Sequence, residues 1–158
     1  MATANILTLA DAIVSAINTA WTGKGANDSV SRVYLAPVSV DDLDSLTGRK
    51  VYVFPGPYDN GLANRGEDEW TYTLGILIVE RYTDAGDPTT AWIDDRVDFV
   101  EGTVGETIDY NGRTLLSISS RRIWTESIEV ETYNLESLNQ KKIFWSVLTA
   151  VFKELKAG

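Results

Sequence analysis

The chain has 158 residues, 44% of them hydrophobic and 10% aromatic, which is enough to bury the core of one domain. It contains no cysteine and no histidine, which excludes a disulfide framework, a thiolate zinc site, a Ser-His-Asp triad and a Cys-His dyad. The net charge is −9, and residues 37–109 carry sixteen acidic against five basic side chains, so the middle of the chain is poorly suited to sequence-specific nucleic-acid binding.

The N-terminal stretch MATANILTLADAI has no basic region and no continuous apolar run, so we expect no signal peptide. The longest aliphatic run, ILIV, is too short to cross a membrane. We therefore expect a protein made in the cytoplasm, without a membrane partner.

The first predicted element is an amphipathic helix at residues 8–22, with Thr8 as its N-cap and Gly23 as its stop. Its apolar side chains recur at helical spacing. Three strands are then predicted, with a short helix in SVDDLDSL between the first two. The strands cover residues 30–36, 49–54 and 70–82.

A second helix is predicted to start with Asp87 as N-cap and Pro88 at its first position, and to end at Gly102. The Asn111-Gly112 pair in TIDYNGRTLLSIS predicts a hairpin with a type I′ turn. The stretch 121–133 shows no regular period, and Asn134 is expected to cap a brief helix.

The last segment, KKIFWSVLTAVFKEL, fits a helix or a strand. Its β-branched and aromatic content favours the strand. Together these elements predict a single domain over residues 1–158 of the α+β class. Its sheet is mainly antiparallel, with the N-terminal amphipathic helix and the second helix packed on it.

Residues 55–69 have no hydrophobic period and are rich in glycine, proline, asparagine and acids, which predicts a long mobile loop. A phosphate-binding loop is excluded, because GPYDNGLA has leucine and alanine where that motif needs lysine and serine or threonine. YDNG and DYNG lack the full calcium-loop array and are interpreted as turns. An alternative to a merely mobile loop is an arm that binds a neighbour, with these candidate interface residues: Tyr58, Arg65, Glu67, Asp68 and Glu69.

Two further groups of side chains carry alternative hypotheses. Asp94, Asp98 and Glu101 share a helix face and could act as paired carboxylates, although a solvated outer face explains them better. Five aromatic residues could form a sugar-binding platform, although core or interface positions are commoner for them: Trp70, Tyr72, Trp92, Trp124 and Trp145.

The stretch from SRVYLAP through DLDSL, VYVFP and YTLGILIVER, followed by a helix and by IFWSVLTAVF, resembles the tail-terminator or tail-completion proteins of long-tailed bacteriophages. The resemblance covers roughly residues 6–153. It implies an α+β subunit of the virion neck and no catalytic, cofactor-binding or metal-binding residues, so we expect no enzyme activity.

The same resemblance implies a set of partners. The chain would assemble with itself into a ring, a homohexamer that caps the tail tube protein and docks on the head-tail connector protein. DNA would pass through the lumen without specific binding, because six copies at −9 give about −54 and repel phosphate.

Three alternatives remain at this point. A head-closure or connector protein of the same neck would have a similar layout. A small carbohydrate- or peptide-binding module is suggested by the aromatic content, and an acid-pair hydrolase by the carboxylates.

Overall fold

The structure is a computed structural model that describes residues 5–34, 46–64, 67–111, 115–118 and 121–157, and within these it leaves out the side chains of 57–64, 67, 117 and 157. The described elements follow one another as α1 Asn5–Ala20, β1 Ser29–Arg32, β2 Arg49–Asn64, β3 Glu67–Arg81, α3 Thr90–Asp98, the π-helical turn η1 Phe99–Gly105, β4 Leu116–Ile118, β5 Arg121–Glu131, α4 Leu135–Lys141 and β6 Ile143–Ala157.

The strands form a six-stranded sheet in the order β1-β2-β3-β6-β5-β4. β1 pairs with β2 in parallel, and every other described pair is antiparallel. The α+β class with a mainly antiparallel sheet is therefore confirmed. The three longest strands, β2, β3 and β6, lie side by side in the sheet, and the shorter strands β1, β5 and β4 flank them.

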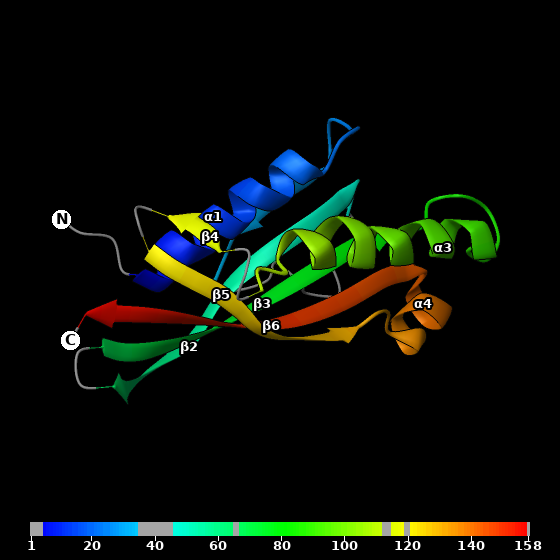
Figure 1. The fold of residues 1–158 in the computed structure, drawn as a ribbon. Helices are drawn as coiled ribbons and strands as arrows, with labels where there is room; N and C mark the ends of the chain where they lie inside the picture. Colours follow the sequence, from blue (N-terminus) through cyan, green and yellow to red (C-terminus); the bar gives the residue numbers. More distant parts are fainter. Residues whose placement is uncertain (1–4, 35–45, 65–66, 112–114, 119–120, 158) are drawn as a thin grey trace.

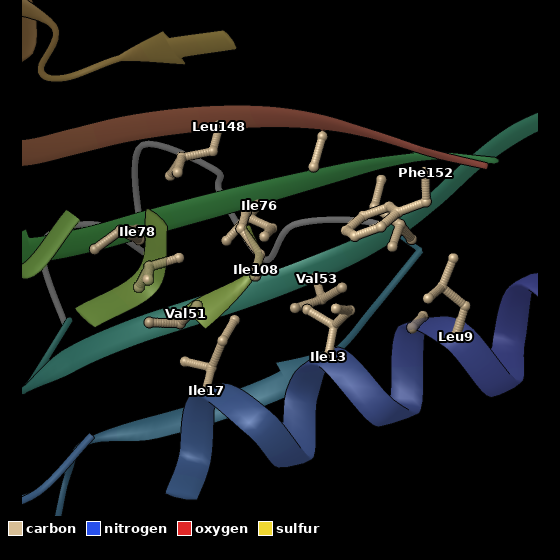
Figure 2. Packing of buried hydrophobic residues seen from close by; sticks show 14 of the residues in the cluster. Leu9, Ile13, Ile17, Val51, Val53, Ile76, Ile78, Ile108, Leu148 and Phe152 are labelled. Carbon is tan, nitrogen blue, oxygen red and sulfur yellow. The ribbon is translucent and has the colours of Figure 1, made fainter. Parts of the chain in front are cut away.

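One face of the sheet is covered by helices, and we call it the helix face. Figure 1 shows α1 and the continuous α3–η1 helix lying on the same side of the strands. The core lies between these two layers, and Figure 2 shows side chains of α1 meeting those of the strands. Its fully buried members include Leu9, Ile13, Ile17, Val51, Val53, Ile76, Ile78, Ile108, Leu148 and Phe152.

The N-terminal helix is confirmed, and α1 buries the apolar stripe that the sequence predicts. It already includes Asn5, so Thr8 lies inside the helix and is not its N-cap. The second helix differs from the prediction at both ends. Thr89, not Asp87, is its N-cap, because the Thr89 side chain accepts a hydrogen bond from the Trp92 N–H. The helix also continues through Gly102 as η1, which buries Phe99, Val100 and Val104. Burial of these apolar side chains outweighs the low helix propensity of one glycine.

The prediction of a loop over residues 55–69 is wrong for most of that segment. Residues up to Asn64 belong to β2 and residues from Glu67 belong to β3, so the segment is a long β-hairpin. β1 pairs with β2 only as far as Val53, so Pro55 lies on a sheet edge, where proline is tolerated. The register shifts between Pro55 and Tyr58, and this bulge absorbs the irregular sequence.

The C-terminal third holds two confirmed predictions and two corrections. β6 is a strand, as its β-branched and aromatic content indicates. The predicted hairpin lacks its first strand, because residues 106–107 continue the helix. Residues 121–131, predicted as irregular, form β5. Asn134 caps α4 as predicted, through a 2.9 Å hydrogen bond from the Ser137 N–H. The short helix predicted in SVDDLDSL lies almost entirely outside the described residues.

Candidate functional site

The residues predicted to form an interacting arm lie at the tip of the β2–β3 hairpin. The backbone of Tyr58 pairs with Tyr72, and Glu67, Asp68 and Glu69 begin β3. Glu69 forms an ion pair with Lys153 of β6, with 2.8 Å between Oε1 and Nζ. Arg65 and the side chains of Tyr58 and Glu67 lie outside the described residues. The hairpin thus brings four of the five predicted positions to one end of the sheet.

Figure 1 shows this end of the molecule extending past α1 and β5, with the ends of β2, β3 and β6 close to the C-terminus. Residues 67–81 of β3 pair along their full length with 143–157 of β6, so the hairpin is braced by a third strand. It is therefore a rigid projection of the sheet, held by backbone hydrogen bonds on both sides of β3.

The second candidate surface is the face of the sheet opposite the helix face, which we call the outer face. Alternate residues of a strand point to opposite faces of the sheet, so the register shows which side chains lie on the outer face. None of the longer described helices lies on this side of the sheet (Figure 1). Its half-buried apolar members include Tyr52, Phe54, Trp124, Trp145, Val147, Val151 and Leu155.

Two shallow hollows open on this outer face. One, of about 290 Å³, is lined by Glu129, Val130 and Glu131 of β5 and by Val147 and Thr149 of β6. The other, of about 320 Å³, is lined by Leu115, Arg122, Trp124 and Leu155. Both are open to solvent, and the first is lined mainly by polar groups, so neither is an enclosed apolar pocket for a small ligand.

A buried ionic cluster around Glu154 lies on the helix face, near the β2–β3 hairpin. The Glu154 carboxylate, 1% exposed, accepts hydrogen bonds from Arg121 Nε at 2.5 Å, Arg121 Nη2 at 2.9 Å and Tyr72 Oη at 2.8 Å. Burial alone would raise the pKa of Glu154, but the hydrogen bonds from Arg121 and Tyr72 outweigh it and hold that pKa below its ordinary value. Burial also raises the pKa of Tyr72, so its hydroxyl remains a donor.

A second ionic cluster lies at the other end of the helix face, around Glu80. Arg49 Nε lies 2.8 Å from Glu80 Oε1, and Arg96 Nε lies 2.9 Å from Glu80 Oε2. The Arg49 guanidinium also lies 4.3 Å from the centre of the Phe99 ring, and that of Arg96 lies 4.3 Å from Trp92. The two arginines thus fix β2 and α3 to β3 through paired charges and aromatic contacts.

These clusters hold the fold together and do not form a reactive group. Each carboxylate in them is bound by arginine, and the described part of the chain has no group of three acidic side chains placed to hold a metal ion. Asp94, Asp98 and Glu101 are exposed, which fits a solvated helix face. Sequence reasoning missed both clusters, since Arg121 and Glu154 are 33 residues apart.

The five aromatic residues considered as a sugar platform do not form one surface. Trp70 and Tyr72 lie on the helix face and stack with their ring centres 6.3 Å apart, but Tyr72 is only 1% exposed. Trp92 of α3 packs edge-on against Tyr82 and Phe144. Trp124 and Trp145 lie on the outer face, but Trp124 pairs with Lys153, far along β6 from Trp145. The aromatic residues therefore serve the core and the outer face separately.

Among the described residues, the structure has no helix long and apolar enough to span a membrane. No protein-family model matches the chain, and no curated protein matches it. A solved structure, the virion of a native gene transfer agent particle, is similar over 94% of this chain and 97% of that chain, at 16% identity and a TM-score of 0.42.

Proposed function

We propose that this protein is a structural protein of a phage-like virion, a tail terminator that caps the tail tube as a ring and joins the tail to the head. The proposal begins from the resemblance of residues 6–153 to such proteins. It includes the absence of enzyme activity and the partners named above: further copies of the chain, the tail tube protein and the head-tail connector protein.

The observation that carries the proposal is the outer face of the sheet. Trp124, Trp145, Val147 and Val151 are only half-buried on this face, and no long helix of the described residues lies over it. Leu77 and Val79 beside them are already buried within the single chain. Partly covered apolar side chains of this kind are typical of a surface that another protein covers. Tryptophan is also enriched in the centres of protein interfaces. A subunit of a larger assembly has a use for such a face, whereas a monomeric enzyme of this size needs a cleft instead.

The hairpin tip supports the same proposal. It projects beyond the helix layer, is braced by β6, and carries an acidic run at Glu67, Asp68 and Glu69. A rigid projection of this kind can reach a neighbouring subunit or the end of a tube without a large loss of conformational entropy on binding.

The first test is the mass of the protein in solution, measured by light scattering over a concentration series, with negative-stain images of the same sample. Six copies of 17.4 kDa give about 104 kDa, and we expect a closed ring of that mass alone or on purified tail tubes. A protein that stays monomeric and does not bind tube ends contradicts the proposal. Binding to isolated connectors but not to tubes would identify the head-closure alternative.

The second test shortens the hairpin. Asn60 is paired with Trp70, so residues 61–69 can be replaced by an Asn-Gly turn that closes the strands at this pair. We expect a folded monomer with an unchanged circular dichroism spectrum but at least tenfold weaker ring or tube binding, because the projecting contacts are lost.

The matched control for the shortened hairpin is Asp84→Ala, in the exposed turn at the opposite end of β3. It should leave both folding and assembly unchanged. If the shortened protein assembles normally, the hairpin tip is not an interface.

A peptide-binding module is the second candidate, and the edge of β5 favours it. Among the described residues, 126–131 of β5 pair with no strand other than β6, and such an edge can accept an extended peptide as an added strand. That function predicts a protein that remains monomeric at all concentrations and binds no tube. The same light-scattering series therefore separates the two.

A further inference from the structure

The sheet has stepped edges on both sides. β1 pairs with β2 only at residues 50–53, and β4 pairs with β5 only at 121–123. Next to β4, Thr125 is held by the segment that follows η1, through a 2.7 Å hydrogen bond from the Tyr110 N–H to Thr125 Oγ1. Among the described residues, 126–131 of β5 therefore have no strand partner on the edge that points away from β6. We call this segment the β5 free edge.

The two steps have complementary positions. The register runs across the sheet from Ser31 through Tyr52, Leu77 and Val147 to Glu131, so β1 lies level with the β5 free edge. At the other end of the strands, β4 lies level with β2 around Asn60, where β2 has lost its β1 neighbour. One edge of the sheet therefore has an extra strand at the level where the opposite edge lacks one, and the reverse holds at the other end of the strands.

The strand directions are also compatible. β1 is parallel to β2, and β2 is related to β5 through three antiparallel pairings, so β1 and β5 run in opposite directions. A second copy placed beside β5 in the same orientation would present its β1 antiparallel to the β5 free edge. Antiparallel pairing supplies backbone hydrogen bonds to both edges without any rearrangement.

The register fixes which side chains would meet at the joint. On the outer face, with Ser31 level with Glu131, the exposed carboxylate of Glu131 would lie opposite Ser31 and that of Glu129 opposite Val33, which follows β1. Like charges therefore do not face each other across the joint.

On the helix face, Val130 of β5 would lie opposite Arg32 of β1, whose aliphatic stem can cover it, and diagonal to Val30. Val130 is 43% exposed, one of the few large apolar side chains left that open in the described chain. Its burial in such a joint would remove apolar surface from water.

We propose that copies of this chain join head to tail through an antiparallel pairing of β1 of one copy with the β5 free edge of the next. This inference rests on the proposed ring, because a head-to-tail contact is heterologous and closes only as a ring. The partner at the β5 free edge is thus a second copy of the chain, and the sheet continues from subunit to subunit.

The test uses cysteine pairs, for which the chain is well suited because it has no native cysteine. Ser31→Cys and Glu131→Cys lie on the same face at the same level, and cross-strand positions meet the geometry of a disulfide. Ser31→Cys mixed with Glu131→Cys should give disulfide-linked dimers on mild oxidation. The double variant should give a ladder that stops at the mass of the ring, and Glu129→Cys covers a shifted register.

The matched control mixes Ser31→Cys with Glu101→Cys, an exposed position on η1 away from both edges. The edge pair should form dimers at least about tenfold faster than this control, because pairing raises the effective concentration of the thiols.

The outcomes separate the joint from the proposed function. A normal ring with no edge-specific disulfide overturns the joint and leaves the neck function standing. A protein that forms neither rings nor edge-specific dimers, alone or on tail tubes, overturns both. Specific dimers that stop at two copies contradict the head-to-tail arrangement.

Discussion

Replacing Arg121 by alanine should lower the free energy of unfolding by about 3–5 kcal/mol at neutral pH, one of the two largest effects expected in this chain. The reason is the burial of its partner. The Glu154 side chain is 1% exposed, and Arg121 provides two of its three short hydrogen bonds. Without the guanidinium, a carboxylate remains in the protein interior with Tyr72 as its one short partner and Lys156 3.6 Å away.

The loss should depend on pH in a definite direction. In the native protein the pKa of Glu154 is lowered from 4.5, so its contribution to stability is present above pH 4.5 and is lost as pH falls through the lower folded value. In Arg121→Ala, burial is no longer outweighed by the arginine, and protonation of Glu154 relieves the buried charge. The difference in stability between the two proteins should therefore shrink as pH falls from 7 toward 4.

Urea denaturation at a series of pH values measures this difference. The control is Arg122→Ala, the exposed neighbour on the opposite face of β5, which should cost less than about 1 kcal/mol at every pH. Equal losses for the two arginines, or a difference that does not change with pH, would show that the Glu154 cluster has no special role in stability.

The sequence predicts most of the elements, because their local signals agree with their tertiary setting. The alternation of β3, with Leu74, Ile76 and Ile78 on one face, is an unambiguous strand pattern, and these side chains are fully buried. β6 is apolar on both faces, so periodicity alone leaves a helix open, and its β-branched residues decide correctly for a strand.

The errors occur where pairing overrides local chemistry. Pro55 and Gly56 indicate a loop, but they lie at a bulge on an edge, where backbone pairing with β3 continues around them. β5 was predicted as irregular because its register shift between Thr125 and Ser127 breaks the alternation. Such a bulge depends on a partner strand that local sequence cannot identify.

The candidate surfaces are partly predictable. The composition of residues 55–69 predicts an interacting segment, which stays a prediction, and it predicts a loop where the structure has the β2–β3 hairpin. The outer face could not be recognised, because the apolar residues of β6 do not reveal which of its two faces the helices cover. The stepped edges follow from the lengths and offsets of β1 and β4, which are long-range properties of the sheet.

Phe152→Ala should be the other most destabilising single change, with a loss of about 3–5 kcal/mol in the free energy of unfolding. Phe152 is fully buried on the helix face of β6, and Figure 2 shows it on the side of the sheet that meets α1, with Leu9 nearby. Removal of the ring would leave a cavity between two rigid layers that cannot collapse to fill it. Out of a typical total of about 5–15 kcal/mol, this loss brings the domain close to unfolding at ambient temperature.

The informative comparison for Phe152→Ala is Val151→Ala, the adjacent position on the outer face, measured by urea denaturation at several protein concentrations. In the monomer Val151 is half-buried, so its loss should cost about 1 kcal/mol and should not depend on concentration. If the outer face is covered in the assembled ring, the cost of Val151→Ala should increase at concentrations where the ring forms, because the lost contact then includes the partner. The cost of Phe152→Ala should stay the same, since its surroundings belong to a single chain. Equal costs for both variants in the monomer would mean that β6 is buried equally on its two faces, which would contradict the assignment of the outer face as an interface.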